Sequence, residues 1–132
     1  MIKTNELMLG DLVYFLTDEL IAKITAIDVT GNIDVEFVRE KISRHSKGYE
    51  TDIYPILLSE DFLLMNGFTK QFQSADKITY SIQDFSISSD GFNNFWFHTD
   101  NDKYIMVDYV HQLQHILKSL NMYDIADNLK IK

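Results

Sequence analysis

Two stretches of alternating apolar and polar residues constrain the fold more than any other feature of this sequence. In the first stretch, Ile33, Val35 and Phe37 alternate with acidic residues, which is the period of a half-buried β-strand. A turn signal, Thr30-Gly31-Asn32, precedes this strand, and two runs rich in strand-forming residues come before the turn. The first 39 residues therefore predict a three-stranded antiparallel meander.

The start of this meander has a distinctive order. Gly10-Asp11-Leu12-Val13 is followed by strand, turn and strand, an order that resembles the opening of small SH3-like barrels. The resemblance implies a partial barrel in the N-terminal region, and it covers less than a third of the chain.

The second alternating stretch covers residues 77–107. Its strand-like runs are separated by the turn signals Ser88-Ser89-Asp90-Gly91 and Thr99-Asp100-Asn101-Asp102. We expect a second antiparallel meander here. The polar residues 40–54 between the two stretches predict a loop, with a ragged strand at Tyr49–Tyr54.

A short helix with two marked ends is predicted between the meanders. Ser59 is a good N-cap, and Glu60 and Asp61 complement the positive end of the helix dipole. Gly67 suits the left-handed conformation that closes a helix. Residues 59–68 therefore predict a compact helix, with Phe68 folding back on it.

The C-terminal region contains the clearest helical pattern, from Asp108, a suitable N-cap, to Leu120. At about 3.6 residues per turn, one face of this helix is apolar. The residues of that face are Tyr109, Val110, Leu113, Ile116, Leu117 and Leu120. The opposite face carries His111, Gln114, His115 and Lys118, which we expect to face solvent. A further helical turn is expected around Tyr123–Leu129.

These elements together predict an α+β fold with two antiparallel β-meanders and a short middle helix. We expect the C-terminal helix to pack on the sheet of the second meander. At 132 residues the chain suits a single domain, 1–132, with sub-lobes at 1–54 and 55–132 as the alternative division.

Composition and missing motifs exclude several classes of function. The chain has no cysteine, which excludes disulfides, cysteine-ligated metals and thiol catalysis. Its net charge of −8 disfavours nonspecific nucleic-acid binding, which needs lysine and arginine to neutralise phosphates. No apolar run has the length of a signal peptide or membrane span, so we expect a cytoplasmic protein. The absence of a phosphate-binding loop, nucleophile elbow or dinucleotide fingerprint predicts no cofactor.

The two histidines of the C-terminal helix form the strongest candidate site. His111 and His115 lie at the i, i+4 spacing of metal ligands, and Asp108 lies one turn earlier. A two-histidine, one-carboxylate set suits a metal-assisted hydrolase. The His-Glu-x-x-His pattern, which supplies the usual general base, is missing. The interpretation we favour is a helix surface on which His111, Gln114 and His115 face a protein partner or solvent.

Two further segments are candidates for binding. An aromatic cluster predicts core, with Trp96 as the residue best suited to contact a partner. The cluster consists of Phe92, Phe95, Trp96, Phe97, Tyr104 and Tyr109.

Residues 39–47 form a basic segment that contains both arginines and could touch phosphate. Glu40 interrupts the basic run, so a solvated loop is favoured. Asp100-Asn101-Asp102 lacks the spacing of a calcium loop, so we interpret it as a hairpin turn.

Four short motifs carry a resemblance that runs along most of the chain. They are Leu9-Gly10-Asp11, Pro55-Ile56-Leu57-Leu58-Ser59, Asn66-Gly67-Phe68 and Val110-His111-Gln112-Leu113-Gln114. Together they resemble a family of small uncharacterised proteins from gut Bacteroidetes genomes, often found near phage-like or mobile elements. The resemblance implies a bacterial or mobile-element origin and supplies no catalytic residue.

The function predicted from these features is a non-catalytic protein-interaction or accessory module with an unknown protein partner. The alternatives are the metal-assisted hydrolase of Asp108, His111 and His115, and a nucleic-acid binder or acidic nucleic-acid mimic.

Overall fold

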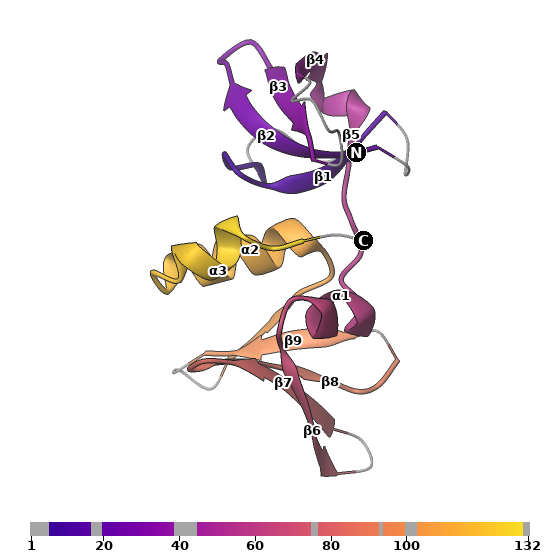
Figure 1. Ribbon diagram of the computed structural model, residues 1–132, viewed down its shortest axis with the longest axis vertical. Coiled ribbons are helices and arrows are strands. Elements are labelled where there is room, and N and C mark those ends of the chain that lie inside the picture. The colour runs from indigo at the N-terminus through magenta and orange to yellow at the C-terminus, as the bar shows by residue number, and fades with distance from the viewer. Residues whose placement is uncertain are drawn as a thin grey trace. The chain divides into compact units, whose positions relative to one another are not determined.

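The computed structural model describes residues 6–16, 20–38, 45–74, 77–92, 94–99 and 103–130 (Figure 1). The chain divides into two compact units. The first unit comprises Met1–Ile56 and Val110–Asp127, and the second comprises Leu57–Tyr109 and Asn128–Lys132. The C-terminal helices therefore belong to the same unit as the first sheet.

The first unit contains a five-stranded antiparallel sheet that curls into a half-barrel. Its strands are β1 (Leu12–Phe15), β2 (Ile21–Ile27), β3 (Asn32–Phe37), β4 (His45–Tyr49) and β5 (Ile53–Tyr54), in the order β4-β3-β2-β1-β5. A short 3-10 helix, η2 (Glu50–Asp52), connects β4 to β5, and two helices, α2 (Val110–Ser119) and α3 (Tyr123–Asp127), complete the unit. This confirms the predicted three-stranded meander and the short helix after Leu120.

The core of the first unit follows from the alternation in β3. Ile33 and Val35 are fully buried, while Asp34 and Glu36, which alternate with them, are half-buried. The inward residues of the sheet join them in one apolar cluster, in which a buried side chain contributes about 1.5–3 kcal/mol. The cluster consists of Leu7, Val13, Phe15, Ala22, Ile24, Ile33, Val35 and Ile53.

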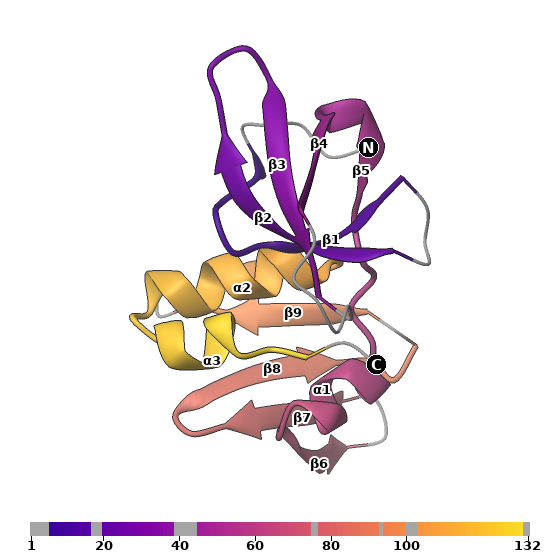
Figure 2. The same cartoon turned by 45° about the horizontal axis from the view of Figure 1, so that its top comes forward.

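The second unit contains another five-stranded antiparallel meander and one helix (Figure 2). The elements are α1 (Glu60–Met65), β6 (Thr69–Ser74), β7 (Lys77–Ile82), β8 (Phe85–Ser89), β9 (Phe95–His98) and β10 (Tyr104–Met106). The strand order is β10-β9-β8-β7-β6, so β6 and β10 form the two edges. The sequence predicted β7 to β10 but missed β6, because this edge strand is mostly polar and its Phe72 is exposed.

The predicted ends of the middle helix are confirmed. The hydroxyl of Ser59 accepts a hydrogen bond from the Phe62 backbone N–H at 3.2 Å. Gly67 has a φ of +89°, and the N–H of Phe68 donates to the Leu63 carbonyl at 3.0 Å. This is the left-handed closure that glycine permits at low steric cost.

Glu60 links α1 to the sheet that follows it. Its carboxylate accepts a hydrogen bond from Lys70 Nζ on β6 at 2.7 Å, and this bond lowers the pKa of Glu60. Burial and the hydrogen bond to Glu60 raise the pKa of Tyr80 on β7 to about 12. The three side chains therefore join the first turn of α1 to two adjacent strands.

A strained leucine follows β1. Leu16 has a φ of +67°, which costs a leucine roughly 1–2 kcal/mol. Its side chain is exposed, so little burial is lost on truncation. Leu16→Gly is expected to raise the free energy of unfolding by about 0.5 kcal/mol, because relief of the strain exceeds the entropic cost of glycine. Urea denaturation measures the change.

Leu20→Gly provides the matched control for that variant. Leu20 is also exposed but is not among the residues with positive φ. This substitution is expected to lower the free energy of unfolding by about 0.5–1 kcal/mol. If both variants lose stability equally, Leu16 stores no strain.

Candidate functional site

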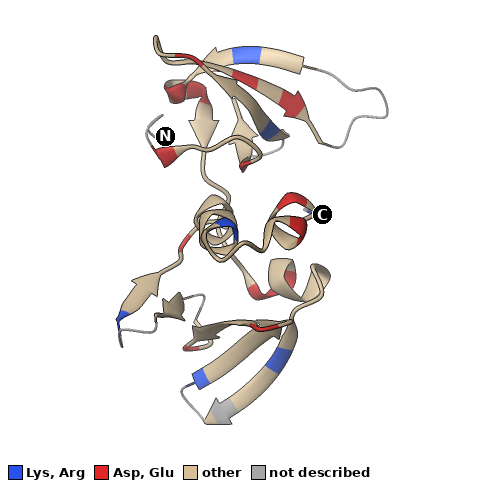
Figure 3. Cartoon of the chain, turned by 90° about the vertical axis from the view of Figure 1, so that its left-hand side faces the viewer, with Lys and Arg blue, Asp and Glu red and all other residues tan. Residues whose placement is uncertain are grey.

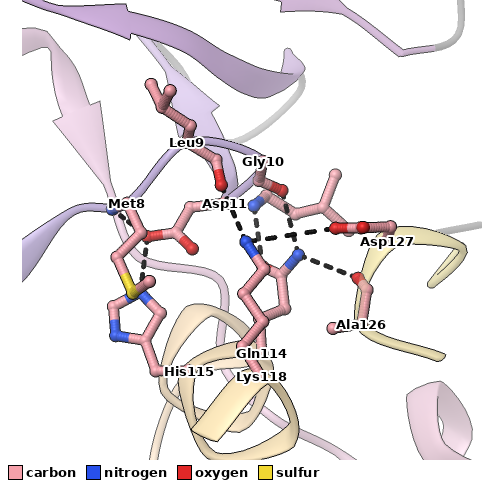
Figure 4. Close-up of polar contacts among 10 residues, drawn as sticks. Met8, Leu9, Gly10, Asp11, Gln114, His115, Lys118, Ala126 and Asp127 are labelled. Atoms are coloured by element: carbon pink, nitrogen blue, oxygen red, sulfur yellow. Dashed lines mark hydrogen bonds and ion pairs between the residues drawn. The ribbon is translucent and has the colours of Figure 1, made fainter. Parts of the chain in front are cut away.

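The polar face of α2 and the segment that leads into β1 form the candidate site (Figure 4). We call this group the polar cluster: Asp11, His111, Gln114, His115 and Lys118. All five residues belong to the first unit. Four of them come from successive positions on one face of α2, and Asp11 comes from the residue just before β1.

The sequence-based expectation that this face is exposed is wrong. His111 is 4% exposed, Gln114 1% and Lys118 9%, and only His115 keeps appreciable exposure, at 26% of its side chain. The face is buried because the backbone of Met8–Leu12 lies against it and forms hydrogen bonds with its polar side chains. Burial of a polar side chain costs least when its donors and acceptors find partners, as those of Gln114 and Lys118 do here.

Gln114 makes the densest set of contacts in the polar cluster. Its Oε1 accepts a hydrogen bond from the Leu12 backbone N–H at 2.8 Å. Its Nε2 donates to the carbonyls of Gly10 at 3.0 Å and Ala126 at 3.3 Å. One buried amide therefore joins the entry to β1, helix α2 and helix α3.

Lys118, one turn further along α2 than Gln114, also contacts the segment before β1. Its Nζ donates to the Leu9 carbonyl at 2.7 Å and lies 4.0 Å from Asp127 Oδ1. The ammonium group is thus committed to a backbone carbonyl, which suits a structural role better than a general base.

Asp11 and His115 are the pair in the polar cluster whose arrangement best suits acid–base chemistry. Asp11 is fully buried, and its Oδ2 lies 2.7 Å from His115 Nε2 while also accepting from the Met8 N–H at 2.8 Å. Its Oδ1 is buried without a hydrogen-bond partner in the described part of the chain. A carboxylate in this position fixes the orientation and tautomer of an imidazole, as in general acid–base catalysis.

His111 lies beside this pair, with its ring centroid 5.6 Å from that of His115. Burial lowers the pKa of His111, and the neighbouring His115 adds to this effect. The charges of Asp11 and Glu6 act in the opposite direction. The net direction is downward from the ordinary value of 6.5, so the neutral imidazole is favoured in the folded chain.

This shift predicts a loss of stability in acid. Well above pH 6.5, His111 is neutral in both the folded and the unfolded chain. Below that pH the unfolded chain takes up a proton that the folded chain resists, so the free energy of unfolding falls until the lowered pKa is reached. The variant His111→Gln is expected to show a smaller fall on acidification below pH 6.5.

Urea midpoints measured across this pH range check the prediction. His45→Gln, which removes a histidine at an exposed position on β4, serves as control. Identical profiles for all three proteins would contradict a contribution from His111.

The structure does not assemble the predicted metal set. The described residues contain no group of three or more His, Asp or Glu side chains that could hold a metal ion, so Asp108, His111 and His115 form no such group. Asp108 is exposed, and its backbone carbonyl accepts the Leu58 N–H at 2.9 Å. The carboxylate next to His115 is Asp11, which the sequence analysis missed because the two residues are separated by 104 positions.

The aromatic cluster is only partly core. Phe95 is buried, whereas Phe92 is 82% exposed and Tyr104 is 64% exposed, so the core interpretation is wrong for the last two. Trp96 is half-buried on β9.

The basic segment 39–47 is described only in part. Residues 39–44 lie outside the described residues, and Lys47 is exposed on β4.

A wide groove of about 740 Å³ lies next to the polar cluster in the first unit. Its lining is mainly apolar: Leu7, Met8, Leu9, Thr25, Ala26, Ile27, Lys118, Tyr123 and Asp127. The Asp11–His115 pair is not part of this lining, and Lys118 is already bound to the Leu9 carbonyl. The groove therefore offers mainly apolar contacts, with Asp127 as a carboxylate in its lining.

Comparisons with known proteins identify no relative. The chain matches no protein-family model, no curated protein and no solved structure. In the described part of the chain, no helix combines the length and apolar character needed to cross a bilayer.

Proposed function

We propose that this protein is a non-catalytic interaction module that binds a protein partner through the outer edge of its second sheet. The observation that supports this best is strand β10. It is the terminal strand of its sheet, and Tyr104, Ile105 and Met106 are exposed at 64%, 45% and 51%. An edge strand with apolar side chains exposed on both faces is a template for addition of a partner strand.

Side chains on one face of this edge form what we call the edge patch: Trp96, His98, Tyr104 and Met106. Tyr104 pairs with His98 and Met106 pairs with Trp96 across β10 and β9, so all four point to the same face. The rings of His98 and Tyr104 stack with centroids 4.7 Å apart. Tryptophan, tyrosine and methionine are the side chains enriched at protein interfaces.

The structural use of the polar cluster supports a non-catalytic role. Gln114 and Lys118 are committed to the backbone carbonyls of Gly10 and Leu9 and to the N–H of Leu12. Asp11 is fully buried behind His115. These groups stabilise the first unit, which explains their placement without a substrate.

Charged residues of both signs occur in each unit. Acidic positions occur on several strands and helices, with lysines on other elements (Figure 3). The proposal includes a cytoplasmic accessory role in a bacterial or phage-like context, which rests on the sequence resemblance.

Site-specific photocrosslinking in the native cell tests the proposed surface. A photoreactive phenylalanine analogue replaces Tyr104 in one protein and Tyr49 in a matched control, because Tyr49 is 60% exposed on β4. We expect a reproducible crosslinked protein at position 104 and none of the same mass at position 49.

A second substitution shows whether that crosslink reports specific binding. Met106→Lys places a charge in the edge patch, and it is expected to reduce the crosslinked product at position 104 by at least about tenfold. Equal crosslinking at both positions, or crosslinking unaffected by Met106→Lys, would count against the edge patch as the binding surface.

A further inference from the structure

Asn66 and Gly67 combine a chemically labile dipeptide with an unusual structural contact. They form the only Asn-Gly pair in the sequence. Asn66 follows the last residue of α1, and Gly67 takes the positive φ that ends the helix. Both residues are at least partly accessible to solvent.

The carboxamide of Asn66 holds the C-terminal segment of the second unit. Its Nδ2 donates to the Lys130 carbonyl at 2.8 Å, and its Oδ1 accepts from the Lys130 N–H at 2.6 Å. Nδ2 also donates to the Phe62 carbonyl at 2.8 Å. The side chain thus pairs with the Lys130 backbone through a donor and an acceptor, as a neighbouring strand would.

An Asn-Gly pair can convert itself without an enzyme. The backbone nitrogen of Gly67 would attack Cγ of Asn66 and form a C–N bond, while the bond from Cγ to Nδ2 breaks. The proton from the Gly67 nitrogen leaves with Nδ2 as ammonia. Water then opens the resulting succinimide to an aspartyl or isoaspartyl residue. Glycine permits this attack because it has no Cβ to hinder it.

The folded geometry restrains both reacting groups. The N–H of Gly67 donates to the Leu64 carbonyl at 3.2 Å. The carboxamide is held by the three hydrogen bonds to Lys130 and Phe62. Reaction therefore requires that the carboxamide rotate away from Lys130, which means that the C-terminal segment must first open.

We propose that Asn66-Gly67 is a self-modification site controlled by the segment 128–130. While the segment is seated, the amide is protected, and when it opens, deamidation follows. The product carboxylate can still accept the hydrogen bond from the Lys130 N–H, but it has no N–H to donate, and its other oxygen faces the carbonyl oxygens of Phe62 and Lys130. Repulsion replaces the two donated hydrogen bonds, which weakens the hold on the segment and favours its open state.

Peptide mass spectrometry after incubation at mildly alkaline pH tests the control by the segment. Leu129 is buried, and Leu129→Ala is expected to loosen the segment and speed deamidation at Asn66 by about tenfold over wild type. Lys130→Ala serves as the matched control, because its side chain is exposed and its backbone contacts are kept. It is expected to react at the wild-type rate.

Amide hydrogen exchange provides a second, independent measurement. In the variant Asn66→Asp, the Lys130 N–H is expected to exchange at least about tenfold faster, while the Phe68 N–H keeps its protection. Asn121→Asp, at an exposed position outside this unit, should change neither amide. Equal deamidation in wild type and Leu129→Ala, or an unchanged Lys130 amide in Asn66→Asp, would overturn the proposal.

Discussion

Replacing Gln114 with leucine is expected to lower the free energy of unfolding by about 3 kcal/mol. Leucine nearly matches glutamine in volume, so the substitution removes hydrogen bonds without opening a large cavity. The Leu12 N–H and the Gly10 carbonyl would then be buried without their present partner. Chemical denaturation monitored by circular dichroism measures the loss.

Gln71→Leu is the matched control for this prediction. Gln71 is exposed on the edge strand β6, so its replacement should change the free energy of unfolding by less than about 0.5 kcal/mol. A loss below about 1 kcal/mol for Gln114→Leu would mean that water replaces the amide and that the polar cluster is not the anchor of α2.

Replacing Gly48 with alanine is expected to lower the free energy of unfolding by about 2–3 kcal/mol. A Cβ at this position would lie 2.7 Å from Cε2 of Phe15 and 2.8 Å from Oδ2 of Asp52. Phe15 is 2% exposed in the core of the half-barrel, so its ring has little room to move. The Asp52 oxygen also accepts the Tyr49 N–H at 2.9 Å, which ties η2 to β4.

A double-mutant cycle separates steric overlap from backbone effects. Phe15→Leu alone should destabilise the core, but in the Gly48→Ala background it should cost less, giving a coupling of about 1 kcal/mol or more. Ser46→Ala, on the same strand, controls for a change in strand propensity. Additive effects in the cycle would contradict the close approach of Gly48 to Phe15.

The half-barrel shows where local patterns suffice and where they fail. The alternation of Ile33, Val35 and Phe37 predicts β3 because every second side chain enters the core. Strand β4 lacks this signal, since its buried residue is Gly48 and its neighbours are polar. Glycine at the inward position of a strand gives no apolar signal in the sequence. Such a strand is recognised only when the structure shows the aromatic ring that packs against the glycine.

The same limit applies to the candidate site. The i, i+4 spacing of His111 and His115 correctly places both on one face of α2. The spacing carries no information on the carboxylate that one of them contacts, so it points to the nearby Asp108 and not to Asp11. The edge patch was anticipated only at Trp96, because exposure of β10 depends on its position at the end of the sheet.

Local sequence patterns are sufficient to predict the α+β class, the two meanders and helices α1 and α2, because periodicity, capping and turn preferences act over a few residues. The tertiary structure alone decided that the polar face of α2 is an internal anchor. Gln114 meets Leu12 across 102 positions and His115 meets Asp11 across 104. Whether a polar helix face is exposed to solvent or buried depends on the hydrogen-bond donors and acceptors of backbone segments that are distant in the sequence. No local sequence pattern encodes that pairing.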